Sequence, residues 1–255
     1  MASAQDVSLE NTTDTLSIAD EIESTNNLEI NEATTVEDNV ANEINNGGDV
    51  ATTPSEENNN EYKTFSELNS EITNQLVSGN TVTLDYDYKN TDSYSAKGIT
   101  ITQSNIVING QGHTIDGNNA GRIFYITGNN ITLKNLIFIN GNYAASGEGG
   151  GAIQGAVGDL IINNCSFINN TATNQGGAIR GGNGDTTIIN STFTNNTATK
   201  DGGAIYSYGK DFIVINSTFT NNRATESGGA IMTANNNDFK VSNTKFANNK
   251  AYEDL

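Results

Sequence analysis

Four aspartates recur at a regular interval in the second half of the chain, and they are the first candidates for chemistry. They are Asp159, Asp185, Asp211 and Asp238, at intervals of 26, 26 and 27 residues. Stacked carboxylates could bind a divalent cation such as Ca²⁺, and two carboxylates in one cleft could hydrolyse a glycosidic bond. The regular interval favours a turn residue that recurs once in each repeat. We therefore predict no catalytic residue, no metal site and no cofactor, and weak cation binding by this column is the open alternative.

The only histidine and the only cysteine of the chain lack partners for catalysis. His113 lies in the string GQGHTIDG (110–117) with no nucleophile nearby, so we interpret it as a turn residue. Cys165 aligns in the repeat with Leu136 and Ser191 at an inward position. This placement predicts a buried and inert thiol.

Outward positions of the repeat carry side chains that suit binding. One strip falls on the exposed face of predicted strands, where a solvated sheet would carry Thr or Lys, and consists of Ile161, Ile189, Ile213 and Ile215. A contiguous apolar strip of this kind suggests contact with a partner, another domain or a covering loop.

A second outward column follows the recurring string GGAI. It consists of Gln154, Arg180, Tyr206 and Met232, with Tyr208 two residues after Tyr206. Arginine and aromatic side chains on a rigid sheet suit sugar stacking or contact with a protein. We predict ligand binding by Arg180, Tyr206, Tyr208 and Met232, and by the isoleucine strip.

A repeat of about 26 residues positions these side chains. The string GGAI begins at Gly150, Gly176, Gly202 and Gly228. A phenylalanine, with an asparagine three residues before it, recurs at Phe138, Phe167, Phe193, Phe219 and Phe246. All but the first of these open an F-x-N-N string. Three markers that share one period indicate stacked repeats.

Each repeat contains two predicted strands joined by a bend. The residues seven and five positions before each Phe are mostly apolar, which is the alternation of a strand with one buried face. The Asn breaks this alternation, and Asn tolerates the left-handed conformation of a tight bend. Because one coil cannot bury its own apolar face, the coils must stack. We predict an all-β, right-handed parallel β-helix of about seven coils.

The sequence divides into three parts. Residues 1–60 hold 14 Asp and Glu and no Lys or Arg, which predicts a disordered acidic leader. Residues 61–80 begin with a capping box from Thr64 to Glu67 and continue with apolar residues at helical spacing, which predicts a helix that caps the first coil. Residues 81–255 are assigned to the β-helix, which we expect to be truncated because the chain stops inside a repeat.

Charge and hydropathy exclude two classes of partner. The net charge is −18, but residues 61–255 hold 16 acids against 12 bases, so the leader carries most of the charge. The folded part has no basic stripe that could bind nucleic acid. The chain contains no run of 18 apolar residues, which is the length needed to insert into a membrane.

Ala2-Ser3-Ala4 looks like the end of a cleaved export signal. We expect an exported monomer.

The pairing of GGAI with F-x-N-N resembles the repeats of chlamydial polymorphic membrane proteins. The helix with its FSEL string, the GQGHTIDG segment and the Asn- and Thr-rich coils are similar to adhesin-like surface proteins of gut methanogenic archaea. The resemblance covers roughly residues 62–255. It implies a secreted or cell-surface β-helix that attaches to a glycan or protein on host or microbial cells.

Two other functions fit parts of the pattern. The predicted fold also hosts pectate lyases and polygalacturonases, so a carbohydrate-active lyase or glycoside hydrolase is the alternative function. The segments Thr171–Thr173 and Thr197–Thr199 would stack as a T-x-T array like that of ice-binding β-helices, but Arg223 interrupts the array in the next coil.

Two further features depart from the strict repeat or bear on modification. The turn at Asn142–Gly149 is enlarged. Glycosylation sequons at Asn164, Asn190 and Asn216 fall on the predicted bend. If that bend is buried, Asn11 and Asn195 are the better acceptors.

Overall fold

The computed structural model describes residues 62–145, 147–155, 158–235 and 237–252. All of these belong to one structural unit, residues 56–255. The acidic leader predicted for residues 1–60 lies outside the described residues.

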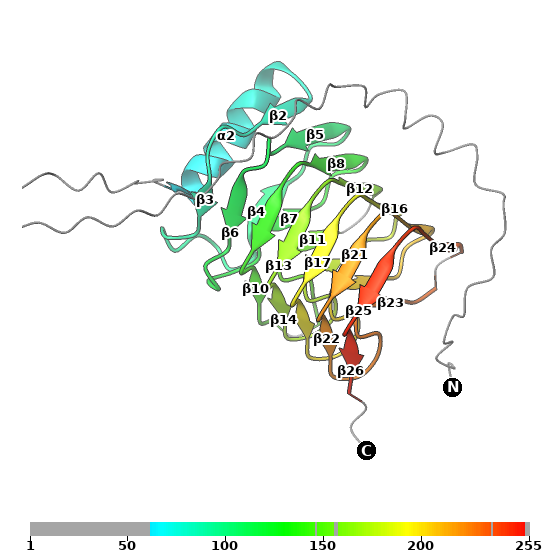
Figure 1. Ribbon diagram of the computed structural model, residues 1–255. Helices are drawn as coiled ribbons and strands as arrows, with labels where there is room; N and C mark the ends of the chain where they lie inside the picture. The colour runs from blue at the N-terminus through cyan, green and yellow to red at the C-terminus, as the bar shows by residue number, and fades with distance from the viewer. Residues whose placement is uncertain (1–61, 146, 156–157, 236, 253–255) are drawn as a thin grey trace, which may run out of the picture. The chain divides into compact units, whose positions relative to one another are not determined.

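The described chain winds as a parallel β-helix, so the fold class predicted from the repeat is confirmed (Figure 1). Each strand pairs in parallel with the equivalent strands of the neighbouring coils, as β12 pairs with β8 and β16. The interval of 26 residues thus returns the chain to the same sheet, with Leu160 beside Thr186 and Phe167 beside Phe193.

A full coil passes in turn through four sheets. The seven-stranded sheet consists of β2 (Thr81–Thr83), β5 (Ile106–Asn109), β8 (Ile131–Lys134), β12 (Leu160–Asn163), β16 (Thr186–Ile189), β20 (Phe212–Ile215) and β24 (Phe239–Ser242). The eight-stranded sheet consists of β1 (Lys63–Thr64), β3 (Tyr88–Lys89), β6 (Thr114–Asp116), β9 (Ile137–Ile139), β13 (Ser166–Ile168), β17 (Thr192–Thr194), β21 (Thr218–Thr220) and β25 (Lys245–Ala247).

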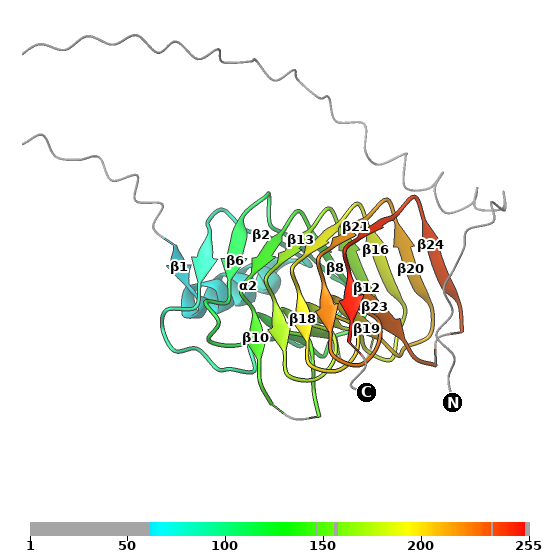
Figure 2. The ribbon, with the colours of Figure 1, turned by 60° about the horizontal axis from the view of Figure 1, so that its bottom comes forward.

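The chain then enters the two smaller sheets. The five-stranded sheet consists of β10 (Asn142–Tyr143), β14 (Thr171–Ala172), β18 (Thr197–Ala198), β22 (Arg223–Ala224) and β26 (Lys250–Ala251). The six-stranded sheet consists of β4 (Ile99–Ile101), β7 (Phe124–Ile126), β11 (Ile153–Gly155), β15 (Ile179–Arg180), β19 (Ile205–Ser207) and β23 (Ile231–Thr233). The five-stranded sheet starts two coils later than the seven- and six-stranded sheets, at β10 (Figure 2).

The described residues contain one helix, α2 (Phe65–Ser78), which lies at the N-terminal end of the stack (Figure 1). The predicted capping box is present, because the Thr64 hydroxyl accepts the N–H of Glu67 and the Glu67 carboxylate accepts the N–H of Thr64. The apolar stripe of α2 joins the core of the first coils through Phe65, Leu68 and Ile72. The helix therefore covers the apolar end that the first coil would expose.

The cap also satisfies backbone groups at the sheet edge. The Gln75 side chain accepts the N–H of Thr83 and donates to its carbonyl, both at 2.8 Å. These bonds replace those of a neighbouring strand beside β2, which leaves less free edge for another chain to pair with.

Asparagines bend the chain at both ends of the eight-stranded sheet. The predicted bend residues all have positive φ, from 47° to 55°: Asn135, Asn164, Asn190, Asn216 and Asn243. A second series with φ from 51° to 57° follows the sheet: Asn140, Asn169, Asn195, Asn221 and Asn248. Asn accepts this left-handed geometry at lower cost than most residues.

The last Asn of each F-x-N-N string forms a ladder inside the protein. The Asn196 amide donates at 3.0 Å to both Oδ1 of Asn222 and the carbonyl of Phe167. Its Oδ1 accepts the backbone N–H and the side-chain amide of Asn170, both at 3.0 Å. The series continues from Asn222 to Asn249. The ladder therefore supplies buried polar groups with partners from coil to coil.

The phenylalanine column forms the centre of the core. Ring centroids of successive coils lie 4.8, 4.7, 4.6 and 5.1 Å apart along Phe138, Phe167, Phe193, Phe219 and Phe246. Five residues after Phe167, Phe193 and Phe219, the small residues Ala172, Ala198 and Ala224 lie on the inner side of the five-stranded sheet. Large and small residues thus alternate within each coil.

The GGAI corner brings the backbones of successive coils into close contact. A Cβ atom on Gly177 would lie 2.2 Å from the carbonyl oxygen of Gly203, so only Gly fits there. In the coil before the first GGAI, Phe124 pairs with Ile153, so the corner is the string GRIF (121–124). Arg122 therefore takes the place of the second Gly of GGAI.

Candidate binding surface

The predicted Arg–Tyr column forms one row on the outer side of the six-stranded sheet. Neighbouring strands place Tyr125 beside Gln154, Gln154 beside Arg180, Arg180 beside Tyr206, and Tyr206 beside Met232. Gln154 is buried, with 4% of its surface exposed, whereas the other four are half-buried. The structure thus brings the predicted residues together and adds Tyr125, which the sequence analysis did not select.

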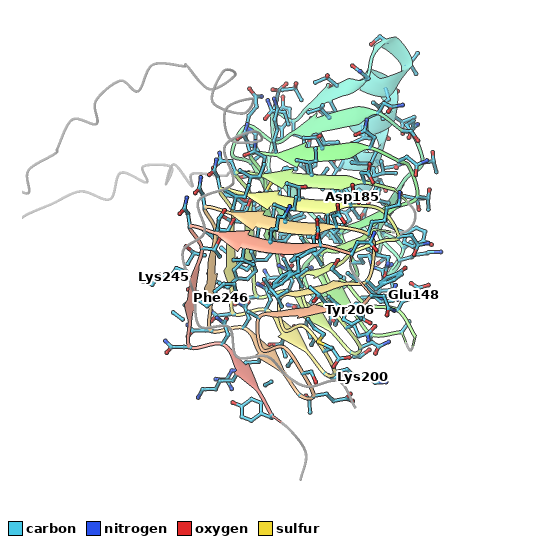
Figure 3. All side chains as sticks on the ribbon, turned by 90° about the vertical axis from the view of Figure 1, so that its right-hand side faces the viewer. Glu148, Asp185, Lys200, Tyr206, Lys245 and Phe246 are labelled. Carbon is cyan, nitrogen blue, oxygen red and sulfur yellow. The ribbon has the colours of Figure 1, made fainter. Side chains whose placement is uncertain are left out.

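Arg180 is held in place by its neighbours. Its guanidinium carbon lies 4.8 Å from the centre of the Tyr208 ring, and the Tyr206 and Tyr208 ring centres are 6.2 Å apart. Its Nε atom is buried without a partner among the described residues, as is Oε1 of the adjacent Gln154. Figure 3 shows Tyr206 and Glu148 on the right-hand side of the molecule in that view. Arg180, Tyr206 and Tyr208 therefore form one preorganised cluster.

The enlarged turn at Asn142–Gly149 closes over Arg122, which is fully buried. The guanidinium donates to the carbonyls of Gly149 and Gly150 at 2.7 and 3.0 Å and pairs with Glu148 at 3.3 Å. It also lies 3.6 Å from the centre of the Tyr143 ring. The turn after β10 projects beyond the turns of later coils (Figure 2).

Electrostatic interactions keep this buried arginine paired. Burial raises the pKa of the Glu148 carboxyl, but hydrogen bonds from Tyr143 and Arg122 outweigh it, and the net pKa lies below the usual value. Burial lowers the pKa of Arg122, and Tyr143 and Glu148 oppose this shift. A carboxylate and a guanidinium that face each other favour their charged forms.

This cluster also explains why the turn is enlarged. Tyr143 pairs with Ala172, so this large residue stands at the start of a column in which the next coils carry alanine. No strand precedes β10 in that sheet. Tyr143, Arg122 and Glu148 therefore fill the end of the sheet. The sequence analysis noted the turn but not Arg122, because the string GRIF shares only its first residue with GGAI.

The isoleucine strip is less continuous than the sequence suggested. Ile189 pairs with Ile215, but Thr187 separates Ile161 from Ile213. Ile189 is only 6% exposed, and the other three are half-buried. Parallel strands place outward β-branched side chains side by side, so that they cover one another. The strip is therefore a small apolar patch, and its role in binding stays a prediction.

The aspartate column makes backbone contacts between coils. Oδ1 of Asp159 accepts the N–H of Asp185 at 2.9 Å, and Oδ1 of Asp185 accepts the N–H of Asp211 at 3.2 Å. The described residues include no group of three or more His, Cys, Asp or Glu that could hold a metal ion. These bonds agree with the interpretation of the aspartates as turn residues.

The single histidine and cysteine occupy structural positions. Nδ1 of His113 lies 3.1 Å from the Asp87 carboxylate beside the first bend of its coil. Cys165 is 2% exposed, and burial raises the pKa of its thiol to about 12. The prediction of a buried Cys165 is confirmed.

The expectation for glycosylation acceptors needs one correction. Asn164, Asn190 and Asn216 are exposed at the bend, so burial does not disfavour them relative to Asn195. Asn11 lies outside the described residues.

The T-x-T segments do stack, since Thr171 pairs with Thr197 and Thr197 with Arg223.

A hollow of about 540 Å³ lies on the outer side of the first bend. It is lined by Asn109, Gln111, Gly112, Asn135, Leu136, Ile137, Asn164 and Ser166. The bend between β5 and β6 has four residues, against two between β8 and β9, so it overhangs the next coil. Hydrogen bonds of 2.8 Å join the amides of Asn109, Asn135 and Asn164. The hollow is uncharged, unlike the Arg180 row.

Comparison with known proteins gives one family match. Residues 164–182, 190–208 and 216–234 match the Chlamydia polymorphic membrane protein repeat. No curated protein and no solved structure matches the chain. The matched segments each contribute one residue to the outward row, namely Arg180, Tyr206 and Met232.

The match bears on location more than on chemistry. Repeats of the polymorphic membrane protein type suggest an outer-surface location. In the part of the chain that the structure describes, no helix is long and apolar enough to cross a membrane.

Proposed function

We propose that this chain is a cell-surface attachment protein that binds a glycan or protein of host or microbial cells through the outer face of its β-helix. The observation that carries the proposal is the Arg180–Tyr206–Tyr208 cluster within repeats that match a surface-protein family. The wider kinship with adhesin-like proteins of gut methanogenic archaea belongs to the same proposal.

A binding role suits the physical setting of the cluster. Tyr and Arg are the residues that most often dominate binding energy at interfaces. Arg180 and Tyr206 lie on β15 and β19, whose backbones are fixed by neighbouring strands on both sides. A side chain that is already held in one place loses little conformational entropy when a ligand binds.

The test is attachment of the full chain to candidate host and microbial cells. We expect the double variant Arg180→Ala, Tyr206→Ala to lower cell binding at least tenfold, which is the usual effect of removing two interface anchors. The control is Arg223→Ala, Tyr252→Ala, which removes the same two residue types from another part of the surface. Both residues are exposed, Arg223 donates to the Tyr252 hydroxyl at 3.3 Å, and Arg223 lies in the five-stranded sheet.

The outcomes separate attachment from its alternatives. Equal binding by the two double variants would remove the Arg180 cluster as the attachment site. The same chain is incubated with a panel of polysaccharides, and release of unsaturated or reducing sugar ends would favour the carbohydrate-active enzyme instead.

A further inference from the structure

Three cationic side chains lie beside the outward row of the six-stranded sheet, in a chain with a net charge of −18. Lys97 lies 4.1 Å above the Tyr125 ring, and Arg122 lies 5.6 Å from the same ring. Arg180 is two strands from Tyr125, which is about 10 Å at the usual strand spacing. Three cations thus flank one row of side chains.

Only one of these cations has an acidic partner. Glu148 pairs with Arg122, but no carboxylate of the described residues lies within 4.0 Å of Lys97 or Arg180. A half-buried arginine without a counter-charge is partly dehydrated and attracts an anion more strongly than a fully solvated one.

Polar atoms on this face also lack partners. Nε of Arg180, Oε1 of Gln154 and Nη1 of Arg122 are buried and make no hydrogen bond with a described residue. A buried polar atom without a partner costs about 1–3 kcal/mol. Two of these atoms are neighbours, because Gln154 and Arg180 lie on adjacent strands.

The aromatic rings beside the cations favour a sugar over an acidic peptide. Tyr125, Tyr206 and Tyr208 are half-buried around Gln154 and Arg180. Tyrosine rings offer flat apolar faces to the C–H side of a pyranose.

We propose that this row binds a carboxylated sugar, such as a uronic or sialic acid residue of an acidic glycan, with the carboxylate on Arg180 and the sugar ring on Tyr206 and Tyr208. Lys97 and Tyr125 contact the next residue of the glycan. This inference rests on the proposed attachment function and names the chemistry of its ligand.

Calorimetry on the full chain tests the inference with defined probes. The acidic probes are a galacturonic acid oligomer and sialyllactose, and the neutral probes are a galactose oligomer and lactose. We expect at least one acidic probe to bind at least tenfold more tightly than its neutral counterpart. We also expect its affinity to fall as NaCl is raised, because salt screens charge pairs.

Two variants locate the site. Arg180→Met keeps the apolar stem and is expected to remove the preference for the acidic probe, whereas Arg223→Met removes a charge elsewhere and is expected to change affinity less than twofold. Lys97→Met, at an exposed position, is expected to weaken binding of the oligomer. It provides a second readout should Arg180→Met unfold.

The result distinguishes this inference from the attachment function. Equal affinity for acidic and neutral probes, tight binding of a poly-glutamate peptide, or loss of binding only in Arg223→Met would overturn the acidic-sugar site. If cells still attach through Arg180 and Tyr206 in that case, the proposed function stands and only the ligand class is wrong.

Discussion

Replacement of Asn196 by Ala provides the sharpest test of how the coils hold together. The Asn196 side chain takes part in four hydrogen bonds of 3.0 Å and is fully buried. The variant leaves the backbone N–H of Asn170 without a partner, at a cost of about 1–3 kcal/mol, and the other three lost bonds cost about 1 kcal/mol each or less. We expect a total loss of about 3–5 kcal/mol in the free energy of unfolding, which is a large share of the stability of an ordinary domain.

Urea unfolding of the full chain, followed by circular dichroism, measures this loss. The matched control is Asn195→Gly, at the neighbouring position, where the side chain is exposed and φ is 57°. Gly accepts positive φ, so the control is expected to change the free energy of unfolding by less than about 0.5 kcal/mol. If Asn196→Ala is destabilised by no more than about 1 kcal/mol relative to the control, the buried ladder does not hold the coils together.

Three further predictions follow from the core and the aspartate column. Phe193→Ala removes a ring stacked at 4.7 and 4.6 Å and should cost about 3–5 kcal/mol in urea unfolding, whereas Phe246→Ala, at a ring 48% exposed, should cost much less; equal losses would contradict the stacked core. Because burial raises the pKa of the Cys165 thiol to about 12, the neutral form persists through pH 8, and a thiol reagent should label the protein only after unfolding. Because Asp159 already accepts the N–H of Asp185, millimolar Ca²⁺ should leave the melting temperature unchanged, and a rise of several degrees would favour the cation ladder.

The parts of the fold that repeat could be predicted from the sequence because stacking imposes the same residue at the same place in every coil. The Phe core, the bend asparagines and the GGAI corners each recur at least four times, so one pattern is sampled repeatedly. The helix cap could be predicted for a different reason. Its capping box is a local signal that needs no knowledge of the partner surface.

The buried ladder was harder to predict because two Asn columns look alike in the sequence. Alternation from Phe193 would point Asn195 inward, but the left-handed conformation of Asn195 reverses the alternation, and Asn196 points inward instead. A backbone conformation, not a residue type, decides which of the two is buried. The string F-x-N-N therefore does not by itself show which Asn belongs to the core.

The candidate site was predictable only in its repeated part. Arg180, Tyr206 and Met232 share one position in successive repeats, so their alignment follows from the period. Arg122 occurs once, in a degenerate corner, and its contacts with Tyr143 and Glu148 depend on where the five-stranded sheet begins. Because Arg122 occurs in one coil only and its partners lie in the next, the repeat does not predict its contacts.

The beginning of the five-stranded sheet links the scaffold to the proposed binding row. Because β10 has no preceding strand, the coil must fill that end with large side chains, and Tyr143, Arg122 and Glu148 do so. The same turn brings Gly149 against the Arg180 side chain, where a Cβ atom on Gly149 would lie 3.0 Å from Cδ of Arg180. The turn that completes the sheet therefore also fixes the arginine to which we assign the sugar carboxylate. Variants of the turn should consequently change ligand affinity and stability together, whereas variants of Tyr208, which lies beyond the turn, should change affinity alone.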